Sequence, residues 1–329
     1  MNGWIILDKP LGLGSTQAVG AVKRVCRAAG LGKVKVGHGG TLDPLATGVL
    51  TIALGEATKL TGRMLDASKS YDFTIAFGTQ TDGLDAEGAV VATSDVRPTL
   101  TQIAAVLPRF TGPIEQVPPA YSAIKVDGKR AYDRARAGEV VEMAARGVTV
   151  HTLTITSNPA CPELTEGPLF SSSPSEEKDD LSTSSEQAGG DGMPLNNVTL
   201  SAHVSKGTYI RSLARDIAYA VGTVGHVTML RRTRAGPFGL ESAISLDKLE
   251  SLAQGAQQSE VILPFEAGLV DIPALVLSPE AAEAVRQGRV LTGVATDDGL
   301  YWAHGGDERP LALVSISAGT LNIVRGFNL

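Results

Sequence analysis

The residues best suited to chemistry lie in a glycine-rich segment, residues 37–48, which reads Gly-His-Gly-Gly-Thr-Leu-Asp-Pro-Leu-Ala-Thr-Gly. It holds one histidine, His38, and one carboxylate, Asp43, placed directly before a proline. Such a segment could cradle a phosphate, form a structural Asp-Pro turn, or hold a carboxylate rigidly as a nucleophile or base. It matches neither common phosphate-binding spacing, and an acid at its centre would repel an anion. Local chemistry alone does not choose among the three interpretations.

The elements predicted around this segment are those of a mixed α+β chain with antiparallel hairpins. Strands are predicted at residues 3–7, 49–54, 71–77, 148–157 and 198–204, and helices at residues 99–110, 132–136 and 211–220. Ser15 is predicted to cap a further helix, which ends near Gly30. A short strand at residues 90–92 is expected to pair with residues 71–77 across a turn-rich stretch.

Two regions differ from the rest in composition. Residues 158–195 are acidic, serine-rich and low in complexity, which predicts a disordered insert between two neighbouring strands. Residues 261–329 hold several short strand patterns and follow a polar linker, which predicts a small β-rich domain. The net charge of −6 arises in these two regions. The remaining residues have an excess of basic side chains, so the acidic total does not exclude a polyanionic partner.

The composition argues against a membrane or secreted protein. No apolar stretch approaches the roughly 20 residues needed to span a bilayer, and the first residues lack the basic start of a signal peptide. The two cysteines, Cys26 and Cys161, form no Cys-x-x-Cys pair, so neither a disulfide framework nor a zinc site is expected. We expect a cytoplasmic protein.

Residues 37–48 and several other segments resemble the bacterial tRNA pseudouridine-55 synthase family of pseudouridine synthases. The other similar segments are residues 3–10, 55–59, 69–71, 78–82, 118–125, 128–132 and 205–211. Together the matches cover most of residues 1–240 in the family's order. One departure is that the family's frequent His-Thr-Gly reads His38-Gly39-Gly40 here, which weakens any hydroxyl role at position 39.

The resemblance implies an α+β pseudouridine synthase catalytic domain over residues 1–250, with a central mixed, mainly antiparallel sheet. Residues 261–329 are similar to the RNA-binding β-barrel module called PUA. The implied reaction turns uridine into pseudouridine in the T-loop of tRNA, at position 55. This isomerisation has no net redox change or hydrolysis, so we expect no cofactor and no metal. The expected partner is tRNA, bound through its T-arm stem-loop by a monomer without an obligatory protein partner.

The resemblance also implies roles for individual residues. Asp43 would be the catalytic carboxylate, and the fork of the Arg211 guanidinium would pair with it and favour its charged form. A stacked uridine cannot be reached, so the base must be extruded. Tyr71 would stack on that base, with Tyr209 as a second aromatic residue and Leu230 as an apolar wall. RNA binding is assigned to His38, Lys9, Lys59 and Lys125.

Two other functions remain open from the sequence. One is a pseudouridine synthase for another RNA, similar to the guide-dependent enzymes, which normally need protein partners and carry basic extensions that this chain lacks. The other is an RNA chaperone without catalysis. The joint presence of Asp43, Tyr71, Tyr209 and Arg211 argues against the second.

Overall fold

The structure, a computed structural model, describes residues 1–122, 124–126, 128–139, 141–157, 192–252 and 261–329. These residues form two units, one of residues 1–71 and 230–329 and one of residues 72–229. The division falls within two strands, β4 (Lys69–Phe77) and β12 (Gly225–Ala235). Most of the predicted insert and the predicted linker lie outside the described residues.

The first unit is built on a mixed sheet. Its strands are β1 (Gly3–Lys9), β2 (Val36–His38), β3 (Ala46–Leu54), β13 (Phe238–Gly239) and β14 (Ile244–Ser245), together with the end of β12. The strand order is β14-β1-β3-β12, with β2 paired to β3 and β13 to β12. The β1–β14 and β3–β12 pairs are parallel and the others antiparallel. This confirms the predicted mixed, mainly antiparallel sheet.

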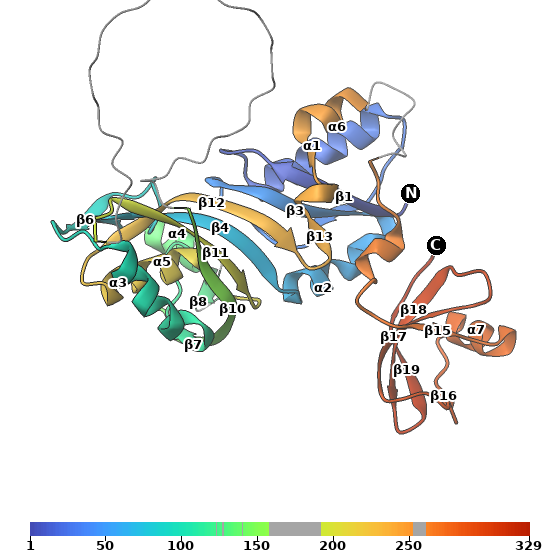
Figure 1. Ribbon diagram of the computed structural model, residues 1–329. Helices are drawn as coiled ribbons and strands as arrows, with labels where there is room; N and C mark the ends of the chain where they lie inside the picture. The colour runs from blue at the N-terminus through green and yellow to red at the C-terminus, as the bar shows by residue number, and fades with distance from the viewer. Residues whose placement is uncertain (123, 127, 140, 158–191, 253–260) are drawn as a thin grey trace, which may run out of the picture. The chain divides into compact units, whose positions relative to one another are not determined.

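Two helices, α1 (Ser15–Ala28) and α6 (Leu246–Leu252), lie together over β1 and β3 (Figure 1). They bury an apolar cluster in which Val22 and Cys26 of α1 and Leu249 of α6 meet Ile5 and Leu50 of the sheet. The short helix α2 (Thr61–Asp66) follows a 3-10 helix at Gly55–Leu60. The sheet therefore has a packed apolar layer beneath the turn that carries Asp43.

The prediction that Ser15 caps α1 is wrong. Gly14 occupies the cap position, and its backbone N–H donates to the side-chain oxygen of Gln17 at 2.8 Å. The Ser15 hydroxyl is buried and bonds instead to the backbone of Leu42, 27 residues away in the chain. Ser15, the first residue of α1, thus holds the segment that precedes Asp43 through hydrogen bonds.

The second unit contains the strands β7 (Gly112–Gln116), β10 (Arg146–Ser157) and β11 (Asn197–Val204), paired antiparallel in the order β11-β10-β7. The β10–β11 pair confirms that residues 158–195 join neighbouring strands. Its helices are α3 (Leu100–Val106), α4 (Ala131–Arg136) and α5 (Ile210–Ala220). Two small ribbons complete it, β5 (Thr79–Thr81) with β6 (Val90–Thr93), and β8 (Lys125–Val126) with β9 (Lys129–Arg130).

The predicted pairing of residues 90–92 with residues 71–77 is wrong. The ribbon forms between β5 and β6, because the chain turns at Gly78 before it reaches residue 79. Gly78 has a φ of 94°, and a Cβ there would lie 2.2 Å from the Arg97 guanidinium. The glycine therefore separates β4 from the hairpin that follows.

The C-terminal part of the first unit is β-rich, as predicted. Its five strands, β15 (Ala274–Val276), β16 (Leu291–Thr292), β17 (Gly299–His304), β18 (Pro310–Ser317) and β19 (Thr320–Gly326), pair in the order β15-β17-β18-β19-β16. Helix α7 (Pro279–Arg286) covers them, with Ala282 and Val285 buried against Val314 and Leu321. Ser278 caps α7 by accepting a hydrogen bond from the Ala281 N–H.

Candidate active site

Asp43 lies in the turn between β2 and β3. These strands pair antiparallel from Val36 opposite Leu54 to His38 opposite Ile52. The pairing continues to Gly39, whose N–H donates to the Thr51 carbonyl at 2.9 Å. A Cβ at Gly39 would lie 2.4 Å from Cβ of Met64. In this chain the space beside residue 39 is therefore filled by α2, which gives a packing reason for the glycine.

All five consecutive carbonyls from residue 40 to residue 44 accept hydrogen bonds. Arg232 donates to the oxygens of Gly40 and Thr41, at 3.4 and 3.3 Å. The Ser15 hydroxyl donates to the Leu42 oxygen at 2.9 Å and accepts from the Leu42 N–H at 2.8 Å. The Ala46 N–H donates to the Asp43 oxygen at 3.0 Å, and the Gly12 N–H to the Pro44 oxygen at 2.9 Å. The backbone that carries Asp43 is thus fixed although it belongs to no helix or strand.

Lys9 lies under the same turn and is fully buried. Its ammonium donates to the carbonyls of Pro10, Leu13 and Pro44 at 2.9, 2.7 and 3.1 Å. Burial lowers the pKa of Lys9 from 10.5 to about 8, the nearby Asp43 carboxylate opposes this shift, and Arg232 adds to it. Lys9 therefore contacts the turn in two ways. Its ammonium donates a hydrogen bond to the Pro44 carbonyl, and its positive charge lies near the Asp43 carboxylate.

Tyr71 and Leu230 lie against the same part of the sheet. Both are half-buried and pack on the apolar cluster that contains Leu42 and Ala46. In the parallel pairing of β3 with β12, Leu230 lies opposite Ala46, three residues after Asp43. The structure therefore brings the predicted stacking tyrosine and the predicted apolar wall to the cluster that supports the Asp43 turn.

His38 ends β2, at the start of this turn. Its Nδ1 accepts a hydrogen bond from the Gly40 N–H at 3.4 Å. Burial and then the charge of Arg232 lower the pKa of His38 below its usual value. Such a histidine is neutral at pH 7, so a contact with RNA from this position would be a hydrogen bond or a stacking contact rather than an ion pair.

Arg211 and Tyr209 lie in the second unit, at the start of α5. The buried Arg211 guanidinium donates to the carbonyls of Gly83 and Tyr121, at 2.7 and 2.9 Å. It also forms an ion pair with Asp85, with Nη1 2.9 Å from Oδ2. The backbone N–H of Tyr209 donates to the side-chain oxygen of the buried Gln116 at 2.8 Å, and the amide of Gln116 donates back to the Tyr209 carbonyl. The pairing of Arg211 with Asp43 stays a prediction.

Two further lysines, Lys59 and Lys125, are assigned to RNA binding, and this role stays a prediction for both. The Lys59 ammonium lies 2.7 Å from the Glu56 carboxylate and donates to the Gly326 carbonyl at 3.0 Å. These contacts attach the C-terminal strand β19 to the residues after β3. Lys125 is in the ribbon strand β8 of the second unit.

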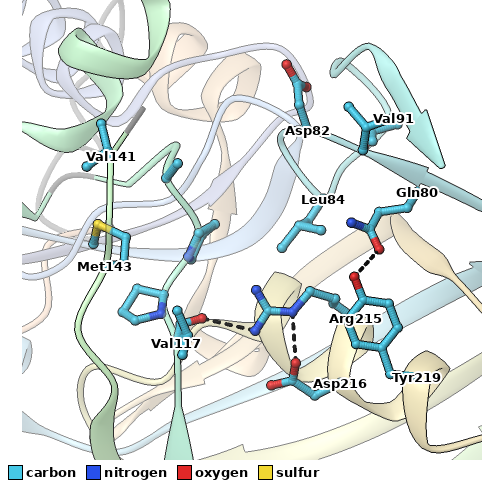
Figure 2. Close-up of a pocket in the computed structure, with 14 residues that line it drawn as sticks. Gln80, Asp82, Leu84, Val91, Val117, Val141, Met143, Arg215, Asp216 and Tyr219 are labelled. Atoms are coloured by element: carbon cyan, nitrogen blue, oxygen red, sulfur yellow. Dashed lines mark hydrogen bonds and ion pairs between the residues drawn. The ribbon is translucent and has the colours of Figure 1, made fainter. Parts of the chain in front are cut away.

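Figure 2 shows a pocket of about 570 Å³ in the second unit, beside α5. The Arg215 guanidinium lies at its base, bonded to the Asp216 carboxylate at 2.8 Å and to the Val117 carbonyl at 3.2 Å. The Tyr219 hydroxyl donates to Gln80 at 2.6 Å across its side. None of the predicted site residues is among those that line this pocket.

Three residues make contacts that the sequence did not predict: Ser15, which was expected only as a helix cap, and Asp85 and Arg232, which were not singled out. Asp85 stands in the turn-rich stretch after β5, where an acid is unremarkable. Arg232 is one of three arginines in five residues, and only burial separates it from its neighbours. The local pattern carried no signal for these roles, because each side chain finds its partner far away in the chain.

Among the described residues, no group of three or more His, Cys, Asp and Glu side chains is arranged to hold a metal ion. Within the same residues, no helix has the length and apolar character needed to cross a membrane.

Two family models match the chain. The N-terminal domain of the TruB family of pseudouridylate synthases matches residues 27–164, and the C-terminal domain of tRNA pseudouridylate synthase B matches residues 211–270. A tRNA pseudouridine synthase B of Novosphingobium aromaticivorans is 63% identical and aligns over 100% of this chain and 98% of its own length. One of Zymomonas mobilis is 50% identical over 100% of this chain and 96% of its own.

Solved structures with a similar fold are more distant in sequence. A chain of an H/ACA ribonucleoprotein bound to a substrate RNA containing 2′-deoxyuridine has a TM-score of 0.67 and 21% identity, over 99% of this chain and 85% of that one. A chain of the archaeal box H/ACA Nop10–Cbf5 complex has a TM-score of 0.66 and 22% identity, over 99% and 86%. At such identity the likeness shows the fold alone.

The two family models place the chain in a class of protein, the pseudouridine synthases. Within that class, the identity to full-length relatives is decisive. The chain belongs to the TruB family of tRNA pseudouridine synthases, and it isomerises uridine to pseudouridine in tRNA.

Proposed function

We propose that Asp43 performs this isomerisation on a uridine extruded from the T-loop of tRNA, at position 55. The observation that carries the proposal is the fixed turn of residues 40–44, which holds one carboxylate next to the cluster bearing Tyr71 and Leu230. A nucleophile or base acts best when its position is set before the substrate arrives. The fixed backbone provides that condition for Asp43.

The reaction assigns a task to each of these residues. The bond between N1 and the ribose breaks, the uracil turns, and a bond forms from C5 to the ribose, while C5 loses a proton and N1 gains one. The carboxylate of Asp43 acts at the sugar while the base is detached. Tyr71 and Leu230 hold the extruded base, and Arg211 pairs with Asp43 in the complex. Because atoms are only rearranged, the chemistry needs no redox cofactor.

RNA binding is proposed for several residues of the two units, Lys59 among them. His38 contacts the extruded nucleotide from the start of the turn, and Tyr209 provides the second aromatic surface. Lys9 supports the turn through its buried ammonium. Lys125 lies in the β8–β9 ribbon with Lys129 and Arg130, which together offer positive charge to phosphates.

The proposal extends to the organisation of the protein. Residues 1–250 form the catalytic domain, and residues 261–329 form a PUA-like module whose role is to contact RNA. The enzyme acts as a monomer on the T-arm stem-loop, without an obligatory protein partner. Because its substrate is tRNA, we place it in the cytoplasm.

The test is the substitution Asp43→Asn, which keeps the shape of the side chain and removes its charge. We expect tRNA and an isolated T-arm stem-loop to bind with wild-type affinity and to form no pseudouridine within a single-turnover assay. An active Asp43→Asn enzyme would overturn the assignment. Wild-type modification at a uridine outside the T-loop would instead favour a synthase for another RNA site.

A further inference from the structure

We propose that Arg232 and Ser15 are positioning residues for Asp43, which hold the backbone of residues 40–42 so that the carboxylate meets the target ribose. This inference rests on the proposed role of Asp43. Neither side chain is proposed to touch the substrate. Each acts through the backbone of the turn.

Arg232 joins the strand and the turn through a single guanidinium. Its Nε donates to the Val49 carbonyl of β3 at 2.7 Å, and its two terminal nitrogens donate to Gly40 and Thr41. Because the guanidinium is rigid and planar, these three hydrogen bonds fix residues 40 and 41 relative to residue 49. Gly40 has a φ of 145°, a conformation that L side chains rarely adopt, so the backbone at this point of the turn favours a glycine.

The burial of Arg232 is unusual for an arginine. Only 2% of the residue is exposed, and removal of a guanidinium from water costs several kcal/mol unless hydrogen bonds replace the water. Its backbone pairs with Gly48 in the parallel β3–β12 register. That register needs no charged side chain at this position. The contacts that offset the cost of burial are those made to β3 and to the turn.

Ser15 fixes the next residue of the turn from another element. Its hydroxyl is both donor to and acceptor from the backbone of Leu42, at 2.9 and 2.8 Å. Leu42 immediately precedes Asp43, so a rotation of its peptide groups would move the Asp43 side chain. Arg232 from β12 and Ser15 from α1 therefore fix three consecutive residues before Asp43.

The adjacent arginine gives a matched control. Arg231 forms a two-point ion pair with Asp8, at 3.1 and 2.8 Å, and donates to Thr47, and both of these partners lie outside residues 40–44. Arg231→Lys and Arg232→Lys change the same chemistry at neighbouring positions of one strand. Only Arg232→Lys removes hydrogen bonds to the turn of residues 40–44, whereas Arg231→Lys removes contacts with Asp8 and Thr47.

The experiment measures single-turnover pseudouridine formation on a T-arm stem-loop at saturating enzyme, together with the dissociation constant of the stem-loop. At saturation, an unfolded fraction of enzyme leaves the rate constant unchanged, so a purely structural role would not lower it. We expect Arg232→Lys and Ser15→Ala to lower the rate constant by roughly 10- to 100-fold. The dissociation constant should stay within about twofold, and Arg231→Lys should keep the wild-type rate constant.

Wild-type rate constants in Arg232→Lys and Ser15→Ala would overturn the inference. If Arg232→Lys does not fold, Ser15→Ala decides alone, because it removes a single oxygen. A rate constant lowered equally in Arg231→Lys would also overturn it, since loss of the turn contacts would then not be the cause. Asp43→Asn is measured alongside: its activity would reject the proposed function, whereas an inactive Asp43→Asn with a normal Arg232→Lys rejects only this inference.

Discussion

Lys9 shows how one buried charge serves two purposes at the residue scale. Its ammonium satisfies three carbonyls, and it lies close enough to the Asp43 carboxylate for that charge to raise the pKa of Lys9. A lysine is rarely buried completely unless its charge is used. The lowered pKa means that the group loses its proton in a range that an enzyme assay can reach.

We expect the wild-type rate constant to fall as the pH rises through about 8, because the neutral amine has two N–H donors for three carbonyls. The free energy of unfolding should change in the opposite direction and rise with pH. The folded pKa lies below 10.5, so the unfolded chain binds more protons between about 8 and 10.5, and the contribution of Lys9 to the unfolding free energy rises with pH.

The measurement is a pH profile of the single-turnover rate for wild type, Lys9→Met and Lys248→Met. Lys9→Met should be slower at pH 7 by about tenfold and should lack the decline near pH 8. Lys248 is exposed, and its variant should match wild type in both respects. If the rate constant of Lys9→Met still declines near pH 8, a group other than Lys9 causes the decline.

Asp85 supplies the charge that fixes Arg211 within the second unit. Removal of this charge in Asp85→Asn leaves the guanidinium with its two backbone acceptors. We expect the single-turnover rate to fall by roughly tenfold while tRNA affinity is kept. Asp216→Asn, which removes a partner from Arg215 one turn along α5, is the comparison. Equal effects of the two substitutions would contradict a special role for the Asp85 contact.

At the scale of elements, residue 48 shows how closely β3 and β12 approach each other. Gly48 has a φ of 95°, and a Cβ at this position would lie 2.2 Å from the backbone oxygen of Arg232. The left-handed conformation and the close backbone both exclude a side chain. The glycine that ends the 37–48 segment is thus required by the pairing that aligns Leu230 with Ala46.

Gly48→Ala is therefore expected to lower the free energy of unfolding by about 2 kcal/mol or more. Gly62→Ala gives the opposite expectation, because Gly62 is helical and exposed with open space at its Cβ position. That variant should be unchanged or more stable by up to about 1 kcal/mol. Urea denaturation of both variants and wild type supplies the test, and equal stabilities would show that the strands can separate at residue 48 without cost.

The elements themselves were largely predictable, because strand and helix periodicities are local. The strands at residues 3–7, 49–54 and 148–157 lie within observed strands. The hydrogen-bond and strand-pairing partners of these elements were less predictable. Ser15 has the chemistry of a helix cap, but its hydroxyl bonds to Leu42, and the strand at residues 90–92 pairs with β5 instead of β4. Hydrogen-bond partners distant in sequence are set by tertiary packing, which no local pattern encodes.

The same limit applies to the candidate site. Resemblance to a family placed Asp43, Tyr71 and Leu230 in one site, and the structure packs Tyr71 and Leu230 on the cluster below the Asp43 turn. The resemblance gave no reason for the turn to be rigid. That reason is in Lys9, Ser15 and Arg232, whose contacts with the turn span from 27 to 192 positions of the chain.

At the scale of the first unit, the C-terminal residues complete a core that begins at β1. The indole N–H of Trp4 donates to the Phe265 carbonyl at 3.1 Å, and its ring lies 5.3 Å from that of Phe238. Phe327, two residues before the end of the chain, packs edge-on against Phe265 with the ring centres 4.7 Å apart. All four residues belong to one buried cluster. The β-rich C-terminal part is therefore expected to unfold together with β1.

Phe327→Ala tests this coupling. Loss of a buried phenylalanine costs about 3 kcal/mol or more, and a shared core should transmit that loss to Trp4. In a Trp302→Phe background Trp4 is the remaining tryptophan of the chain's two, so its fluorescence during urea unfolding reports on β1. We expect the Trp4 transition to shift to lower urea in Phe327→Ala. The exposed neighbour Leu329 provides the control, because Leu329→Ala should change stability by less than about 0.5 kcal/mol. An unshifted Trp4 transition in Phe327→Ala would mean that residues 261–329 fold as an independent domain, with the Phe265–Phe327 contact serving only that domain.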